Sequence, residues 1–244
     1  MSKRRVVVTG LGLITPVGIG VAESWANIIN GQSGIGKITK FDCSSFPSQV
    51  AGEVKNFDPL AYIPPKDARR MDTFIQFGIA AGIEAFKDSG IEVNDSNSER
   101  IGVSVGSGIG GINLIEATGD VFDEGGVRKI SPFFIPGTII NMISGNLSIM
   151  LNLKGPNVSI VTACTTGTHS IGDAARMIEY GDADVMLAGG SEAAITELSV
   201  AGFSSAKALS SRNDDPKTAS RPWDRDRDGF VIGEGAGVMV LEEY

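Results

Sequence analysis

Residues 157–181 read NVSIVTACTTGTHSIGDAARMIEYG, the most informative stretch of the chain. Its first part, residues 157–162, is rich in β-branched side chains and predicts a buried strand. Its second part, residues 165–180, has apolar residues at helical i, i+3, i+4, i+7 spacing, namely Ile171, Ala174, Ala175 and Ile178. Gly181 is a typical helix end. The stretch therefore predicts a strand that turns directly into a helix, with Cys164 at the turn.

The same alternation of strands and helices continues along the rest of the chain. Further strands are expected at residues 5–9, 101–105 and 184–188, and in two short runs between residues 230 and 241. Further helices are expected at residues 23–30 and 68–89. Strands separated by helices imply a parallel or mixed sheet that is covered on both faces. We therefore expect an α/β fold of three layers, α/β/α.

The composition limits the partners and the location of the protein. The chain has 244 residues, 42% of them hydrophobic, and a formal net charge of −8. This acidic balance argues against nucleic acid as the main partner, because phosphate binding needs a basic surface. Two cysteines make no disulfide framework, so we expect a reducing, cytoplasmic location. The uncharged residues 130–153 include prolines and asparagines, which predict a buried or interface helix rather than a membrane span.

A glycine-rich run, Gly106-Ser-Gly108-Ile-Gly110-Gly111, follows the strand at 101–105 and matches the G-x-G-x-x-G pattern of dinucleotide-binding turns. That fingerprint also needs a second strand with an acidic residue about 20 positions further on. Residues 125–132 show no such strand. We therefore expect these glycines to allow close backbone packing, and we expect no nucleotide, other cofactor or metal. A nucleotide-dependent oxidoreductase is the weaker alternative.

Cys164 is the best candidate for a reactive group. A thiol at a strand-to-helix turn lies beside free backbone N–H groups and the positive end of the helix dipole, and both favour the thiolate. The same N–H groups suit a developing oxyanion. The alternative is a buried structural cysteine, a common fate of free cysteines. Cys43, in the loop at residues 41–46, has no such setting, and we expect it to be inert.

His169, the only histidine, lies five residues after Cys164. Five residues along a helix give a net rotation of about 140° and a rise of about 7.5 Å, so the imidazole is expected on another face. We expect a core or interface histidine rather than a partner of the thiol. If Cys164 is a nucleophile, the sequence then offers no evident base.

Basic side chains gather in three places despite the acidic total. Lys66, Arg69 and Arg70 are expected to open the helix at 68–89. Arg128 and Lys129 precede the uncharged stretch, and Lys207 and Arg212 follow Phe203. Each residue alone is ordinary solvated surface, but as a set they suit an acidic partner protein.

Six motifs occur together along the chain. They are VVVTGLG at 6–12, GSGIGG at 106–111, TACTTGTH at 162–169, GDADVM at 181–186, RPWDRDRDGF at 221–230 and GEGAG at 233–237. From residue 3 to residue 244 the chain resembles the N-terminal half of the bacterial β-ketoacyl-acyl-carrier-protein synthase II family, the condensing enzymes of fatty acid elongation. The cysteine motif is highly specific.

The resemblance implies a thiolase-like fold of two similar α/β halves, each with a mixed five-stranded sheet, in a homodimer. It implies that Cys164 takes an acyl chain from acyl carrier protein as a thioester. Malonyl-carrier protein then loses CO2, and the carbanion attacks that thioester in a Claisen condensation. The backbone N–H of Cys164 is implied to be one oxyanion-hole donor.

The resemblance also implies binding residues. Ile109 and Phe203 correspond to acyl-pocket positions, and Phe134 to one that approaches from the partner subunit. The helix carrying Lys66, Arg69 and Arg70 corresponds to the site where the carrier protein docks. The other basic residues expected to bind the carrier are Arg128, Lys129 and Lys207.

In one respect the chain departs from the family pattern. The family's two catalytic histidines, a supporting lysine and the second oxyanion donor lie in the C-terminal half, which residues 1–244 do not include. We therefore expect an N-terminal half that is inactive in condensation on its own. Two alternatives stay open: a non-catalytic ketosynthase-like partner subunit, and a thiolase that acts on coenzyme A thioesters.

Overall fold

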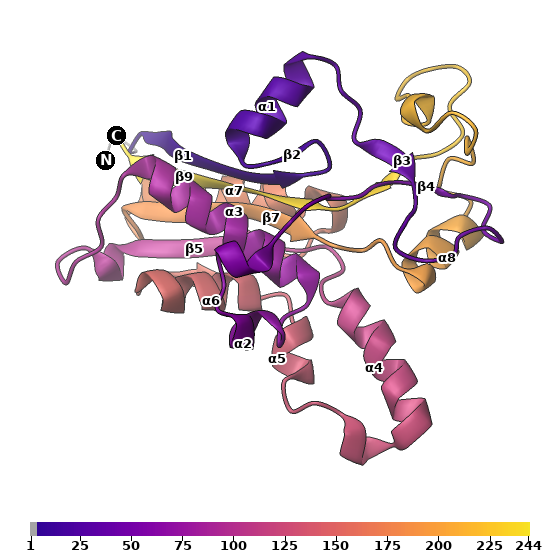
Figure 1. Ribbon diagram of the computed structural model, residues 1–244. Coiled ribbons are helices and arrows are strands. Elements are labelled where there is room, and N and C mark those ends of the chain that lie inside the picture. Colours follow the sequence, from indigo (N-terminus) through magenta and orange to yellow (C-terminus); the bar gives the residue numbers. More distant parts are fainter. Residues whose placement is uncertain (1–3) are drawn as a thin grey trace.

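The computed structural model describes residues 4–244 and has a mixed six-stranded sheet at its centre (Figure 1). The strand order is β2-β1-β9-β7-β5-β6. The strands are β1 (Val6–Thr15), β2 (Gly18–Ile19), β5 (Ile101–Gly106), β6 (Asn157–Val158), β7 (Val185–Glu192) and β9 (Gly235–Glu243). β5 is parallel to β6 and β7, whereas β9 is antiparallel to β7 and β1. The predicted mixed sheet is confirmed.

The sheet has six strands rather than the five expected. The additional strand, β2, arises because the chain reverses after β1, so that Thr15 pairs with Gly18. The Thr15 hydroxyl donates to the Gly18 carbonyl at 3.1 Å and accepts from the Val17 N–H at 3.2 Å. The side chain of Thr15 thus closes the hairpin that adds the sixth strand.

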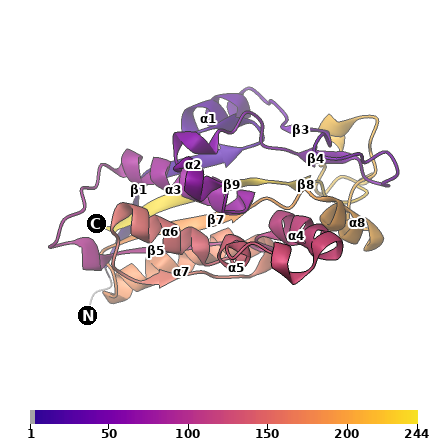
Figure 2. The same ribbon diagram turned by 60° about the horizontal axis from the view of Figure 1, so that its bottom comes forward.

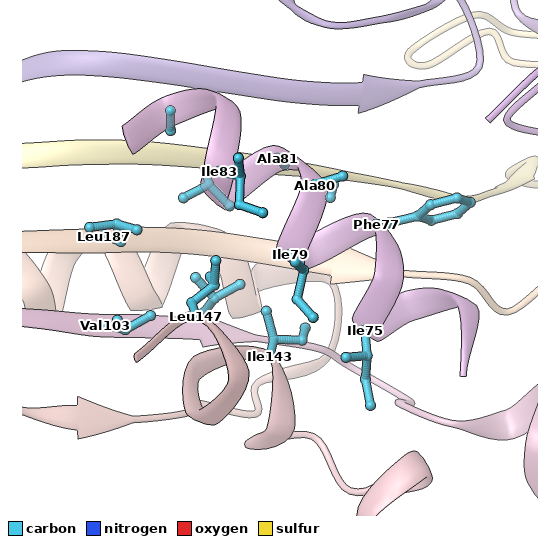
Figure 3. Close-up of a cluster of buried hydrophobic side chains, with 14 of the residues drawn as sticks. Ile75, Phe77, Ile79, Ala80, Ala81, Ile83, Val103, Ile143, Leu147 and Leu187 are labelled. Carbon is cyan, nitrogen blue, oxygen red and sulfur yellow. The ribbon is translucent and has the colours of Figure 1, made fainter. Parts of the chain in front are cut away.

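Helices cover both faces of the sheet, as predicted. α3 (Thr73–Ser89) and α6 (Met142–Leu151) lie on one face, and α7 (Thr166–Tyr180) lies behind the sheet in Figure 1. Side chains of β7 alternate between two cores: Leu187 packs with α3 and α6, whereas Met186 and Ala188 pack against α7. Figure 3 shows the first core, where Ile79 and Ile83 of α3 face Leu147 of α6. This alternation defines the three layers.

Smaller elements surround these layers. The remaining α-helices are α1 (Val21–Ile29), α2 (Pro65–Ala68), α4 (Ile112–Gly125), α5 (Phe134–Thr138) and α8 (Glu197–Ser205). The 3-10 turns are η1 (Pro59–Ala61), η2 (Ser98–Arg100), η3 (Val127–Lys129), η4 (Ala163–Thr165) and η5 (Pro216–Thr218). A second, three-stranded sheet contains β3 (Ile35–Lys37), β4 (Val50–Gly52) and β8 (Ile232–Gly233). α4 and α5 pack on each other (Figure 2). Within residues 4–244, each helix is too short or too polar to cross a bilayer.

Two expected helices have other bounds in the structure. The helix expected at 68–89 begins only at Thr73, as α3, because the short helix α2 ends at Ala68 and Asp72 caps α3, accepting from the Phe74 N–H at 3.2 Å. The helix expected within 130–153 is α5 and α6. α6 buries Ile143 but leaves Ile149 79% exposed, so it is buried on one face only.

Three strands differ from their expected lengths. β1 continues through two glycines to Thr15, and β7 continues to Glu192, while β6 is only two residues long. β1 needs glycine at these two positions because α3 crosses the strand too closely for any side chain to fit. A Cβ on Gly10 would lie 2.1 Å from the Ala85 carbonyl oxygen, and one on Gly12 would lie 1.9 Å from that of Ala81. A search for β-branched residues misses a strand extended in this way.

We predict that Gly12→Ala destabilises the protein by about 3 kcal/mol or more, because the new methyl group overlaps backbone that has no room to move. Urea unfolding followed by circular dichroism measures the change. Gly119→Ala is the matched control, since Gly119 is exposed in α4 and nothing lies within 4 Å of the place that the alanine methyl group would occupy. There alanine should be neutral or stabilise by about 0.5–1 kcal/mol. Equal stability of the Gly12→Ala variant and the wild type contradicts the close contact.

A cluster of charged side chains links residues near the two ends of the described chain. Asp184, just before β7, accepts from Arg100 at 2.8 and 3.1 Å and from Arg4 at 2.8 Å. Arg4 also lies 2.8 Å from Glu243 at the end of β9. The hydrogen bond from Arg100, with that from Arg4, lowers the pKa of Asp184 from 3.8 to about 2. The ionised carboxylate therefore stabilises the folded chain.

We predict that this contribution is lost in acid. Since the pKa of Asp184 is lower in the folded than in the unfolded chain, its stabilisation is present above pH 4 and disappears as the pH falls towards 2. Asp184→Asn should lower the melting temperature above pH 4, and the difference from wild type should shrink towards pH 2. Thermal unfolding from pH 2 to 6 measures it, with Asp95→Asn, at an exposed position, as control. A difference that does not change with pH contradicts the assignment.

Candidate active site

Cys164 lies in a strained turn between β6 and α7. It is the middle residue of η4, and the residue before it, Ala163, has φ +52°, a left-handed conformation that costs a non-glycine residue about 1 kcal/mol. Hydrogen bonds hold the turn: Thr165 Oγ1 donates to the Thr162 carbonyl at 2.7 Å, and the Thr162 N–H donates to Thr166 Oγ1 at 2.9 Å. The predicted placement at a strand-to-helix turn is confirmed, with one 3-10 turn inserted before the helix.

The turn presents the thiol outwards. Cys164 is exposed, so the alternative of a buried structural cysteine is wrong. Cys43 is half-buried beside Phe41 and Phe46, with its sulfur 4.0 Å from the Ile38 carbonyl oxygen. The two cysteines therefore differ in setting as predicted, and only Cys164 stands at the start of a long helix.

Glycines bring this turn onto the sheet. A Cβ on Gly190 of β7 would lie 3.0 Å from the Cα of Gly167 in α7. A Cβ on Gly106, at the end of β5, would lie 2.1 Å from the Ile160 carbonyl oxygen. Close backbone packing, the use predicted for the glycine cluster, is thus confirmed. It places the start of α7 at the carboxyl ends of two parallel strands, where α/β proteins bind their ligands.

An apolar cleft of about 890 Å³ opens at this place. Its lining includes Cys164, Ile109 and Phe203, so the structure brings the nucleophile candidate and two of the predicted acyl-pocket residues together. Phe203 of α8 packs edge-to-face on Phe230 at 5.3 Å, which fixes its ring at the cleft wall. Phe134 begins α5 and does not line the cleft of this chain, so its approach from a partner subunit stays a prediction.

The glycine loop (residues 106–111) binds a carboxylate of the chain itself. Glu192, at the end of β7, accepts from the Ser107 hydroxyl at 2.7 Å and from the N–H groups of Gly108 and Ile109 at 2.9 Å each. The Gly110 N–H adds a bond of 3.2 Å. Donors that would hold a phosphate in a dinucleotide-binding turn are therefore occupied. Sequence reasoning missed Glu192, and only the sheet register, which pairs Gly106 with Gly190, brings it to the loop.

His169 is on a different face from the thiol, as predicted. It does not line the cleft, and its Nε2 lies 3.5 Å from Asp173, one helical turn further on. Its side chain is 48% exposed, so the expectation of a core position is wrong, while an interface position stays a prediction. The residue points outward because α7 buries Ser170, Ala174 and Ile178 instead.

No free base faces the thiol among the described residues of the cleft lining. The ionisable lining groups besides Cys164 are Glu192, bound by the loop, and Glu234. Glu234 is paired with Lys40 at 2.5 Å and accepts from the Val54 N–H at 3.0 Å. The cleft of this chain thus combines a candidate nucleophile, Cys164, with an apolar wall.

The predicted carrier-binding residues lie mostly on exposed turns. Lys66 is on α2 and Arg69 follows it, so they do not open the long helix as expected. Arg70 lies 3.8 Å over the ring of Phe133 and is half-buried, which holds it against the start of α5. Arg128 and Lys129 form part of η3, and Lys207 follows α8 with φ +54°. All of these except Arg70 are exposed.

This mixed sheet between helices, with its cysteine turn, is the N-terminal half of a thiolase-like ketosynthase fold. Residues 3–244 match the family model described as β-ketoacyl synthase, N-terminal domain. The chain therefore belongs to the β-ketoacyl synthase family.

Several named proteins are similar to this chain in sequence or in structure. A Vibrio cholerae 3-oxoacyl-[acyl-carrier-protein] synthase 2 is 64% identical over the whole chain, which covers 59% of that protein. A Burkholderia phymatum β-ketoacyl synthase structure is 32% identical, with a TM-score of 0.86 over 99% of this chain and 59% of its own. A type II polyketide ketosynthase, solved in complex with its acyl-carrier protein and bound to a hexaketide, has a TM-score of 0.88 at 32% identity, over 99% of this chain and 59% of its own. The chain spans a little under three fifths of these relatives.

We predict that iodoacetamide alkylates Cys164 well before Cys43, because only Cys164 is exposed and stands beside a helix N-terminus. Peptide mapping after short incubations gives the order of labelling. Cys43→Ser should leave the fast reaction unchanged, and Cys164→Ser should abolish it. Equal rates at both cysteines, or a faster reaction at Cys43, contradict the prediction.

Proposed function

We propose that this chain is the nucleophile-bearing part of a 3-oxoacyl-acyl-carrier-protein synthase, of type 2, that elongates fatty acids in the bacterial cytoplasm. The observation that carries the proposal is the exposed thiol of Cys164 on a strained turn at the wall of a large apolar cleft. The close identity to a named synthase of this type supports it. A thiol in that setting suits an acyl chain that is long, apolar and delivered as a thioester.

The proposed reaction has two stages. In the first, the sulfur of Cys164 attacks the carbonyl carbon of the acyl-carrier thioester; the new carbon–sulfur bond replaces the old one, and the carrier leaves as a thiol. In the second, malonyl-carrier protein loses CO2 and its carbanion attacks the acyl-Cys164 thioester. This step forms a carbon–carbon bond, breaks the bond between the acyl carbon and the sulfur of Cys164, and yields a β-ketoacyl-carrier protein two carbons longer. The sulfur of Cys164 leaves as the thiolate. We assign the N–H of Cys164 as one donor to the oxyanion in both stages.

The base of the reaction belongs to another part of the protein. Residues 1–244 correspond to the N-terminal half of the fold, and we propose that the family's histidines, supporting lysine and second oxyanion donor come from the C-terminal half. The cleft supports this division, since its two carboxylates in the described chain are already bound. This half is proposed to load an acyl chain and not to condense it.

We propose acyl carrier protein as the partner that delivers both substrates. Exposed Lys66, Arg69, Arg128, Lys129 and Lys207 complement an acidic carrier, and Arg70 would join them from its position over Phe133. The polyketide relative solved with its own carrier protein supports this choice.

We also propose a homodimer. β6 is a short strand at the edge of the sheet, and apolar side chains near it are exposed, among them Val161 at 52% and Ile149 at 79%. Exposed apolar patches beside an unpaired strand edge are typical of subunit contacts. In such a dimer, Phe134 is proposed to reach the cleft of the partner subunit.

We predict that incubation with decanoyl-acyl-carrier protein adds one decanoyl group to the chain, measured by intact mass. The adduct should form on Cys43→Ser and be missing on Cys164→Ser. Replacing Lys66 and Arg69 by alanine should slow loading from the carrier protein and leave loading from decanoyl-coenzyme A unchanged, because only the carrier needs the basic surface.

Three outcomes contradict the proposal. Acylation that persists in Cys164→Ser places the reaction elsewhere. Faster loading from coenzyme A than from carrier protein favours a thiolase. Formation of a β-ketoacyl product by these 244 residues alone overturns the proposed division of the active site.

A further inference from the structure

Glu192 is a carboxylate of the cleft lining that is bound entirely by a loop which itself forms part of the wall. Two of its four donors, the N–H groups of Gly108 and Ile109, converge on one oxygen, Oε2. The other two, the Ser107 hydroxyl and the Gly110 N–H, converge on Oε1. Successive backbone N–H groups that point at one anion form a compact anion site, and bonds to an ionised acceptor are about twice as strong as neutral ones.

The glycine loop depends on this carboxylate for its shape. Ser107 reinforces it by accepting from the Gly110 N–H at 3.1 Å while donating to Glu192. Gly110 has a left-handed backbone, with φ +80°, and it lies between β5 and α4, outside the regular hydrogen-bond pattern of either element. Without an anion at its centre, the Ser107 hydroxyl and the N–H groups of Gly108 and Ile109 would lose their acceptor, and the Gly110 N–H would keep only the Ser107 oxygen.

The loop is also bound to the nucleophile turn. A Cβ on Gly108 would lie 2.9 Å from Glu192 Oε2 and 3.2 Å from the Ala163 carbonyl oxygen. The Cα of Gly108 is therefore packed between the carboxylate and the residue that precedes Cys164. Just after the loop, Asn113 of α4 donates to the carbonyl of Ala193, the neighbour of Glu192, at 2.5 Å.

Ile109 is the loop residue that this arrangement holds at the cleft. Its N–H donates to Glu192, while its side chain lines the cleft together with Cys164 and is 39% exposed. A side chain on a loop contributes to selectivity only if the backbone beneath it is fixed. Glu192 fixes the backbone of Ile109 by accepting the hydrogen bond from its N–H.

We propose that Glu192 is a positioning residue, whose carboxylate fills the anion site of the glycine loop and thereby holds Ile109 as the wall that recognises long apolar chains next to Cys164. The inference rests on the proposed function for its biological meaning. The physical claim is that Glu192 fills an anion site of the loop and thereby sets the preference for long apolar groups at the thiol of Cys164. This claim is testable without a carrier protein.

The test compares two thiol reagents, N-ethylmaleimide and N-octylmaleimide, on the Cys43→Ser background, with the rate of Cys164 modification followed by intact mass. The cleft should raise the rate of the octyl reagent relative to the ethyl reagent, measured against glutathione. In Glu192→Ala this ratio should fall about tenfold, because the wall formed by one isoleucine side chain is lost.

Acetate is the decisive addition, because it equals the group that Glu192→Ala removes. Acetate should restore the ratio in Glu192→Ala, whereas acetamide, which is uncharged, and sodium chloride should not. Glu192→Gln keeps one acceptor oxygen and should give an intermediate ratio. Glu53→Ala is the matched control, since Glu53 is a buried glutamate that accepts from the Thr39 N–H and hydroxyl away from the cleft. It should lose stability and keep the wild-type ratio.

A ratio in folded Glu192→Ala within twofold of wild type overturns the inference, as does restoration by acetamide equal to that by acetate. If Glu192→Ala fails to fold, Glu192→Gln and Ser107→Ala decide, and unchanged ratios in both overturn it. Failure of carrier-dependent acylation, with the maleimide and acetate results as expected, refutes the proposed function and leaves the positioning role of Glu192 in place.

Discussion

The site depends on direct contact between the backbones of helices and of the strands beneath them. Gly10 and Gly12 let α3 lie directly on β1, and Gly167 and Gly190 let the start of α7 lie directly on β7. A single methyl group at most of these points would meet backbone atoms at less than van der Waals distance. Because both helices are held so closely, the turn that carries Cys164 is fixed relative to the strand ends, and its thiol faces the same opening as the glycine loop.

That fixed frame supports a turn that is unfavourable by itself. Ala163 has a left-handed backbone, and the turn persists because hydrogen bonds from Thr162 and Thr165 close it and the glycine loop packs against it. Strain of this kind is typical of functional sites, where the surrounding structure holds a residue that would otherwise relax. The polar groups of the loop are held in a similar way. Glu192 accepts from the loop donors, and the cleft beside them stays largely apolar.

The sequence predicted the layers well and the site only in part. Periodicity located α3 and α7, and glycine located their ends, because both signals are local; Gly90 and Gly181 have the expected left-handed conformation. It missed the extension of β1 through Gly10, since close packing against α3 is a long-range contact. It missed Glu192 for a related reason. A glycine-rich turn shows that N–H groups converge, while the nature of their acceptor depends on the strand that lies alongside.

The division of labour proposed for the two halves follows from the energetics of the two stages. Exchange of one thioester for another forms and breaks like bonds, so an exposed thiol and a donor to the oxyanion suffice in principle. Decarboxylation creates a carbanion, and its negative charge must be stabilised by groups aimed at the new charge in the transition state. Glu192 and Glu234 in the cleft lining offer the opposite, carboxylates bound by internal donors. A chain with this cleft is therefore suited to hold the acyl thioester, and the second stage needs cationic or hydrogen-bonding groups that face Cys164 from across the cleft.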